Sequence, residues 1–166
     1  FCLSRGLGDV YKRQEYPDVV VDEQHVDAMA ALLVRRPTDF DVLVTENLFG
    51  DILSDLAAEL AGSLGMAGSI NCSDTKAMAQ ASHGAAPDIA GRGIADPVGI
   101  LASTAMMLRW WGDHRDDDAL IRCASRIDYA VEATLAAGIR TADLGGIAST
   151  REFGDAVAAA TACTPA

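Results

Sequence analysis

The sequence predicts a protein of the α/β class. Two observations carry this prediction. Short apolar segments of strand length alternate with amphipathic helical segments over residues 18–61, and further helical segments follow after residue 97. A chain in which strands alternate with helices is typical of an α/β fold. With 166 residues, the chain is long enough to bury a core.

The first half of the pattern contains two strands, each followed by a helix. Residues 18–22 (Asp-Val-Val-Val-Asp) and 41–45 (Asp-Val-Leu-Val-Thr) are short apolar runs, which predict strands buried on both faces of a sheet. Residues 25–36 and 49–61 carry apolar side chains at helical spacing, which predicts two amphipathic helices.

A glycine-rich segment, residues 62–68, then breaks the pattern. We expect the chain to cross there from one domain, residues 15–61, into a second, residues 62–166. A polar loop follows, and residues 81–97 are rich in Gly and Pro, which predicts an ordered loop.

The rest of the chain predicts three helices, over residues 97–108, 116–137 and 150–160. Pro97 suits the first turn of a helix, and Gly138 suits the end of one. Ser149 or Thr150 is expected to cap the last helix.

Residues 1–14 differ from everything that follows. The segment is basic and has neither helical nor strand periodicity, and its Gly6-Leu-Gly8 lacks the preceding strand and third glycine of a phosphate loop. We expect it to be a non-native leader. The chain begins with Phe rather than Met, and we expect it to be a fragment.

Charge excludes two classes of partner. There are 13 Lys and Arg against 24 Asp and Glu, a net charge of −11. Such a field repels phosphate backbones and anionic membranes but suits a divalent cation. The longest apolar helical stretch, residues 97–108, is too short to span a bilayer. We therefore expect no nucleic-acid partner and no membrane.

The four cysteines, Cys2, Cys72, Cys123 and Cys163, lie far apart, without a CxxC pair. This spacing argues against a zinc site or a disulfide framework. We expect reduced thiols in a cytoplasmic protein.

The sharpest local motif is an acidic pair. Asp51 and Asp55 are four residues apart, so their carboxylates project from one helix face with Cβ atoms about 5–6 Å apart. A divalent cation would remove their repulsion. Spacing alone nevertheless favours a solvated acidic face or carboxylates stabilised by the helix dipole. Asp27, taken alone, is an ordinary first-turn acid.

The second motif is the segment from His83 to Gly91. Its glycines and small residues let a ligand approach the backbone, and Asp88 is able to accept hydrogen bonds from ribose hydroxyls and to repel a 2′-phosphate. No GxGxxG opens a helix here. The residues alone favour an ordered loop, with nucleotide binding as the alternative.

Taken together, four segments resemble the C-terminal half of the β-decarboxylating dehydrogenases, the isopropylmalate and isocitrate dehydrogenase family. They are Val21-x5-Asp27-Ala-Met, Thr45-Glu-Asn-Leu-Phe-Gly-Asp-Ile-Leu-Ser-Asp55, His83-Gly-Ala-Ala-Pro-Asp-Ile-Ala-Gly-Arg-Gly-Ile-Ala95 and Asp143-Leu-Gly-Gly. The resemblance implies an isopropylmalate-dehydrogenase-like fold of two α/β domains with a non-Rossmann nucleotide site, only partly present here. Residues 15–61 would complete the dimer-forming domain, and residues 62–166 would return into the nucleotide-binding domain.

The resemblance also implies a set of ligands. A Mg²⁺ or Mn²⁺ ion would be held by Asp51 and Asp55, with Asp27 supplied across the interface of a homodimer. Asp88-Ile89 resembles the NAD form, since the NADP-dependent branch has a Lys-Tyr pair there. The residues implied in NAD binding are His83, Gly84, Ala85, Ala86, Pro87, Asp88, Ile89 and Asp96.

The implied activity is the oxidative decarboxylation of a 2-hydroxy acid of the 3-isopropylmalate or isocitrate type. The family's arginine clamp, catalytic Tyr and catalytic Lys belong upstream of Glu15, so we expect no catalytic residue here and no activity from this chain alone. Tyr11 and Lys12 do not match those roles. Two positions depart from the family: Gln80 stands where Glu is common, and Asp96 where Asn is common.

Two alternatives follow from these departures and from the charge. One is a non-catalytic, regulatory subunit of the same fold. The other is an acidic interaction module, for which we expect no response to a metal.

Overall fold

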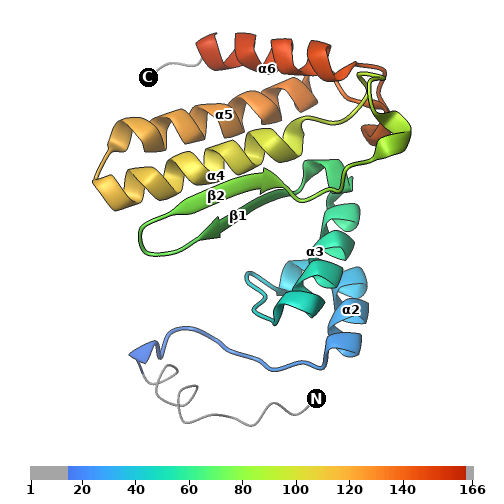
Figure 1. Ribbon diagram of the computed structural model, residues 1–166. Coiled ribbons are helices and arrows are strands. Elements are labelled where there is room, and N and C mark those ends of the chain that lie inside the picture. The colour runs from blue at the N-terminus through green and yellow to red at the C-terminus, as the bar shows by residue number, and fades with distance from the viewer. Residues whose placement is uncertain (1–14, 164–166) are drawn as a thin grey trace. The chain divides into compact units, whose positions relative to one another are not determined.

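The computed structural model describes residues 15–163 (Figure 1). The chain divides into two compact units, with unit 1 ending at Leu56 and unit 2 beginning at Ala57. This boundary falls inside helix α3 (Asn47–Ala61). The predicted leader, residues 1–14, lies outside the described residues.

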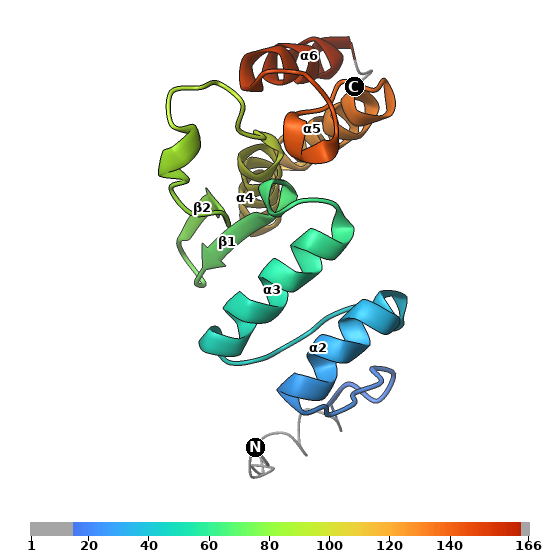
Figure 2. The ribbon, with the colours of Figure 1, turned by 90° about the vertical axis from the view of Figure 1, so that its right-hand side faces the viewer.

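Unit 1 consists of α2 (Val26–Arg35), a short 3-10 turn (Pro37–Asp39) and the first part of α3. Figure 2 shows α2 beside the beginning of α3. Both predicted helices are present, with bounds that differ by one or two residues at the ends. Met29, Leu33 and Leu53 form the small core of this unit.

The two strands predicted in unit 1 are wrong. Residues 18–22 and 41–45 form no strand, and Val20, Val42 and Val44 are 97%, 79% and 93% exposed. A strand exists through hydrogen bonds to a neighbouring strand. Within residues 15–56 neither segment has such a neighbour, so its apolar side chains stay on the surface.

Unit 2 contains a hairpin that the sequence did not reveal. Strands β1 (Gly68–Cys72) and β2 (Ala77–Ala81) pair antiparallel, with Ser69 opposite Gln80. The sequence predicted a glycine-rich break and a polar loop here, because neither strand has the alternating β-branched and aromatic residues that signal a strand. Ser73 N–H donates to the Lys76 carbonyl at 2.8 Å and closes the turn.

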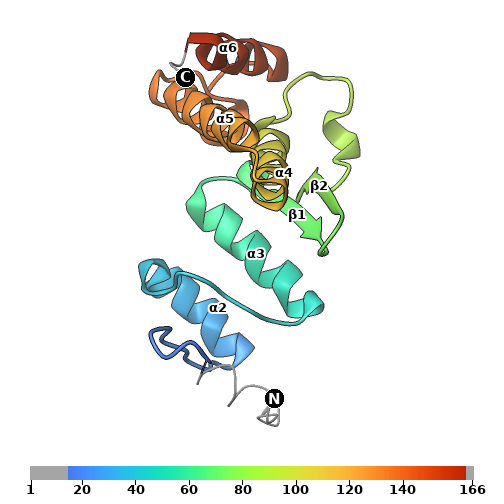
Figure 3. The ribbon, with the colours of Figure 1, turned by 90° about the vertical axis from the view of Figure 1, so that its left-hand side faces the viewer.

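Three helices complete unit 2: α4 (Val98–Arg115), α5 (Asp118–Ala136) and α6 (Thr150–Cys163). Figures 1 and 3 show α4 between the hairpin and α5, with α6 against α5. The prediction of three helices is confirmed, although α4 extends to Arg115 rather than ending at residue 108.

A close approach holds α4 to the turn that leads into the hairpin, Leu64–Met66. A Cβ on Gly99 would lie 2.8 Å from the Gly65 carbonyl oxygen, so glycine is required for this packing. The buried Ser103 hydroxyl accepts from Ser69 N–H at 3.0 Å and donates to the Gln80 carbonyl at 2.7 Å, which ties α4 to both strands.

The core of unit 2 lies between α4, α5 and α6. It consists of Val98, Ala130, Val131, Phe153 and Val157. The expected cap of α6 is Ser149, whose hydroxyl accepts from Glu152 N–H at 3.2 Å while the Glu152 carboxylate accepts from Ser149 N–H at 2.8 Å. Gly138 has a positive φ of +83° and follows α5, as expected. No helix among the described residues is long and apolar enough to cross a membrane.

Candidate functional site

The predicted metal ligands Asp51 and Asp55 lie one turn apart on α3 of unit 1. Both residues are exposed, and Leu53 between them turns inward at 6% exposure. The amphipathic pattern therefore directs the apolar residue to the core and the two acids to the surface. Within residues 15–163, neither carboxylate forms a hydrogen bond or an ion pair, so all four oxygens are available to a cation.

Asp27, the third predicted ligand, lies in the first turn of α2. It is exposed, and its Oδ1 accepts from Ala28 N–H at 2.8 Å. This contact stabilises the beginning of α2, which is the ordinary role of an acid at that position. Its second oxygen forms no hydrogen bond or ion pair with the described residues.

The three acids do not form a complete ligand set within one copy of the chain. Among the described residues, no group of three or more His, Cys, Asp or Glu side chains is placed to hold a metal ion. Asp51 and Asp55 supply the hard oxygen donors that Mg²⁺ and Mn²⁺ prefer. Further donors would have to come from elsewhere.

The predicted nucleotide loop belongs to unit 2 and follows β2. Residues 83–88 are all exposed, whereas Ile89 is half-buried and anchors the loop. His83 Nδ1 lies 2.9 Å from the Gly84 carbonyl oxygen. The carboxylate of Asp88 forms no hydrogen bond or ion pair with residues 15–163, so it is available to a ligand.

The backbone of this loop is held in unusual conformations. Ala86 adopts a left-handed conformation with φ of +41°, and a 3-10 turn follows at Pro87–Ile89. Gly91 and Gly93 also have positive φ, and no atom lies within 4 Å of a Cβ built on Gly84, Gly91 or Gly93. The space over these glycines is open, as a ligand resting on the backbone would need.

Asp96 differs from the other residues of the predicted NAD set because its side chain is buried, at 8% exposure. Its Oδ1 accepts from Val98 N–H at 2.8 Å and so satisfies a free donor at the beginning of α4. Burial raises the pKa of this carboxyl group, and the nearby Asp143 raises it further. The carboxyl group therefore faces the interior of unit 2.

The structure reveals a polar cluster in which the exposed Asp143 meets the buried side chains of Ser63 and Thr141, and the sequence did not predict it as a site. Asp143 accepts from the Ser63 hydroxyl at 2.5 Å and from the Thr141 hydroxyl at 2.6 Å. Burial raises the pKa of Asp143, but these two hydrogen bonds lower it overall. Ser63 and Asp143 are far apart in the sequence, so no local pattern could have joined them.

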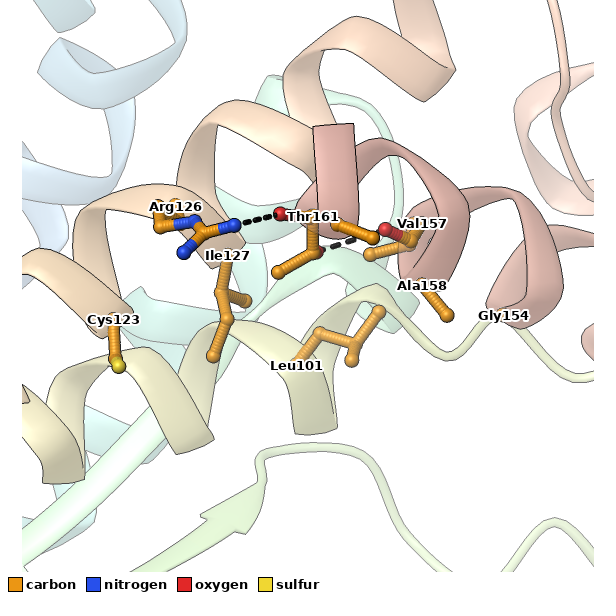
Figure 4. A pocket seen from close by; sticks show the side chains of 9 residues that line it. Leu101, Cys123, Arg126, Ile127, Gly154, Val157, Ala158 and Thr161 are labelled. Carbon is orange, nitrogen blue, oxygen red and sulfur yellow. Dashed lines mark hydrogen bonds between the residues drawn. The ribbon is translucent and has the colours of Figure 1, made fainter. Parts of the chain in front are cut away.

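A shallow apolar groove of about 530 Å³ lies over α4, α5 and α6 (Figure 4). Its walls include Leu101, Ile127 and Val157, and the Arg126 guanidinium at its edge donates to the Thr161 carbonyl at 2.6 Å. None of the predicted site residues lines this groove.

Comparison with known proteins identifies the class of this chain. The sequence pattern of the isocitrate/isopropylmalate dehydrogenases matches residues 4–157. The chain therefore belongs to the isocitrate/isopropylmalate dehydrogenase family.

Individual relatives show how far the similarity extends along the chain. It is 47% identical over 148 residues to a 3-isopropylmalate dehydrogenase of Streptococcus pneumoniae, covering 88% of this chain and 41% of the relative. It is 49% identical over 158 residues to an isocitrate/homoisocitrate dehydrogenase of Thermus thermophilus, covering 93% of this chain and 45% of the relative. The chain thus spans less than half the length of these relatives.

Solved structures support the same fold. An isocitrate dehydrogenase from Methylococcus capsulatus superposes with a TM-score of 0.83 at 41% identity, covering 92% of this chain and 44% of that one. A β-decarboxylating dehydrogenase from Thermococcus kodakarensis gives a TM-score of 0.76 at 38% identity, covering 93% and 44%. The fold predicted from the sequence, an isopropylmalate-dehydrogenase-like fold present in part, is confirmed.

Proposed function

We propose that this chain forms part of an NAD- and Mg²⁺- or Mn²⁺-dependent dehydrogenase that oxidises and decarboxylates a 2-hydroxy acid of the 3-isopropylmalate or isocitrate type. The observation that carries the proposal is the pair of exposed carboxylates of Asp51 and Asp55 on one face of α3. Family membership and relatives named for both substrates support the reaction type.

The metal site we propose is completed by a second copy of the chain. Asp51 and Asp55 supply two ligands from one copy, and Asp27 of the other copy supplies the third. This arrangement agrees with the lack of a three-ligand group within residues 15–163 of one chain. When bound, the ion stabilises negative charge that develops on the substrate as carbon dioxide leaves.

The chain's own residues have two tasks in this proposal. The acids of unit 1 hold the cation and, through it, orient the hydroxy acid. The exposed loop of residues 83–89 holds NAD, with Asp88 accepting hydrogen bonds from a ribose and repelling the 2′-phosphate of NADP. Cys72 and Cys123 are exposed free thiols, which suits the reducing cytoplasm as the location we propose.

Titration with Mn²⁺ tests the metal site directly. We expect the 166-residue chain to bind Mn²⁺, and Asp51→Asn and Asp55→Asn each to weaken binding at least about tenfold, because each removes a charged oxygen ligand. Electron paramagnetic resonance of free Mn²⁺ measures the affinity. Asp118→Asn is the matched control, since it removes one negative charge from an exposed position in the first turn of another helix, α5.

Mixing two variants tests the shared site. Asp27→Asn and Asp55→Asn alone should each bind Mn²⁺ weakly. A mixture should recover part of the wild-type capacity, because one site of a mixed dimer then has all three acids. Equal Mn²⁺ binding by wild type, Asp51→Asn and Asp55→Asn would contradict the proposal and favour a non-catalytic subunit or an acidic interaction module.

A further inference from the structure

Thr150, the first residue of α6, holds the chain just after the predicted nucleotide loop, residues 83–89. Its N–H donates to the Gly93 carbonyl at 2.9 Å, and its hydroxyl donates to the Ala95 carbonyl. Within the part of the chain that the structure describes, no other hydrogen bond joins residues 83–95 to another element. Thr150 is therefore the polar link between this segment and the helices of unit 2.

Both partners in this contact are suited to it. An N–H in the first turn of a helix has no acceptor within that helix, and the positive end of the helix dipole favours an oxygen there. The Gly93 carbonyl supplies that oxygen. Gly93 itself has a φ of +65°, a left-handed conformation that favours glycine. The contact thus satisfies a donor of Thr150 that α6 leaves unpaired.

Helix α6 gives the contact a fixed support. Phe153 is 0% exposed and belongs to the core between α4, α5 and α6. Ser149 and Glu152 cap the beginning of the helix, since Ser149 N–H donates to the Glu152 carboxylate and Glu152 N–H donates to the Ser149 hydroxyl. Thr150 lies between this cap and the buried Phe153, so the core of unit 2 sets its position.

Adjoining turns connect Gly93 to the residues predicted to bind NAD. Ile89 N–H donates to the Ala86 carbonyl at 3.1 Å, and Arg92 N–H donates to the Ile89 carbonyl at 3.1 Å. Asp88 lies within the first of these turns and is exposed. Because each turn begins where the previous one ends, the place of Asp88 depends on where the chain is held at Gly93.

We propose that Thr150 is a positioning residue for the nucleotide: its two hydrogen bonds hold residues 93–95 on α6 and so keep the 83–89 loop in the conformation that binds NAD. The inference deepens the proposed function and rests on it for the identity of the ligand. The attachment of the segment to α6 does not depend on that ligand. A loop that is already held in place loses less conformational entropy when a ligand binds, so its release should weaken binding.

Thr150→Val tests the attachment in the complete 166-residue chain without nucleotide. Valine keeps the branched shape and the backbone N–H but lacks the hydroxyl, so the Ala95 carbonyl loses its donor. The N–H of residue 150 donates to the Gly93 carbonyl, so its rate of amide hydrogen exchange reports whether the segment stays on α6. We expect this rate to rise about two- to tenfold, which corresponds to the loss of one hydrogen bond.

Calorimetric titration with NAD then tests the positioning role. Thr150→Val should bind NAD about two- to tenfold more weakly than wild type. Thr150→Ser keeps the hydroxyl and should restore both the exchange rate and the NAD affinity. Thr104→Val is the matched control, because the Thr104 hydroxyl also donates to a backbone carbonyl, that of Ile100 at 2.8 Å, but within α4. This control should change neither quantity.

The outcomes separate this inference from the proposed function. An unchanged exchange rate at residue 150 in Thr150→Val would overturn the inference, whether or not the chain binds NAD. Faster exchange with unchanged NAD affinity, or a loss of affinity that Thr150→Ser does not restore, would overturn the positioning role. If wild type does not bind NAD, the proposed function fails and the positioning role fails with it, while the exchange rates still decide whether Thr150 holds the segment on α6.

Discussion

The two units of this chain bury their apolar residues to very different extents. In unit 2, Phe153 and Ala130 are both 0% exposed, whereas in unit 1, Val20 and Val44 are 97% and 93% exposed. Phe153 and Ala130 belong to α6 and α5, which pack against each other, whereas Val20 and Val44 lie in segments that form no strand. The hairpin of unit 2 contains both of its strands, while the valine-rich segments of unit 1 have no neighbouring strand within residues 15–56. A helix forms the hydrogen bonds of its backbone groups within itself, whereas a strand forms them with a neighbouring strand.

The largest expected effect tests whether unit 2 has a core of its own. Phe153→Ala should lower the free energy of unfolding by about 3–5 kcal/mol, because it leaves a cavity where α6 meets α4 and α5. Urea unfolding followed by circular dichroism measures the loss.

Ile147→Ala is the matched control within unit 2. Ile147 is fully exposed, so its replacement should change the free energy of unfolding by less than about 0.5 kcal/mol. Similar losses in the two variants would show that unit 2 does not pack around Phe153.

Two glycine variants sharpen the account of packing in unit 2. Gly99→Ala should destabilise the unit by about 1–3 kcal/mol, because the new methyl group would lie 2.8 Å from the Gly65 carbonyl oxygen and push α4 away from the turn that leads into the hairpin. Gly154→Ala in α6 should instead stabilise by about 0.5–1 kcal/mol, since nothing lies within 4 Å of its Cβ and alanine is the better helix former.

Thermal unfolding of the two variants, measured side by side, distinguishes these effects by their sign. A stabilising Gly99→Ala would mean that α4 and the hairpin pack less closely than the structure indicates.

The sequence predicted the features that depend on local spacing. Helical periodicity located α2 and α3, and it placed Asp51 and Asp55 on one face of α3 while Leu53 turned inward. The abundance of Gly and Pro indicated the exposed loop of residues 83–88. The roles of these residues in binding stay predictions.

What the sequence could not predict depends on partners distant along the chain. The hairpin was missed because its strands are stabilised by each other and by Ser103 of α4 rather than by a strong local pattern. Asp96 was predicted among the residues that bind NAD, which stays a prediction, and its carboxyl group is buried close to Asp143. Nothing near Asp96 in the sequence indicates that partner.

The smallest expected effect on stability tests unit 1. Val44→Thr should change the free energy of unfolding by less than about 0.5 kcal/mol, because the side chain is already 93% exposed. Leu53→Ala, at 6% exposure, should cost about 2–5 kcal/mol in this unit. Helix α2 packs on Leu53 through Met29 and Leu33. The rate of amide hydrogen exchange in α2 therefore measures the effect of both substitutions.

The same valines should control association of the chain. Exposed apolar side chains together with unpaired backbone groups favour pairing with other chains. Val44→Thr should therefore reduce self-association of the wild-type chain, as measured by sedimentation velocity, while leaving exchange in α2 unchanged. If Val44→Thr instead speeds exchange in α2 as much as Leu53→Ala does, then Val44 is buried in solution and unit 1 has a core as complete as that of unit 2.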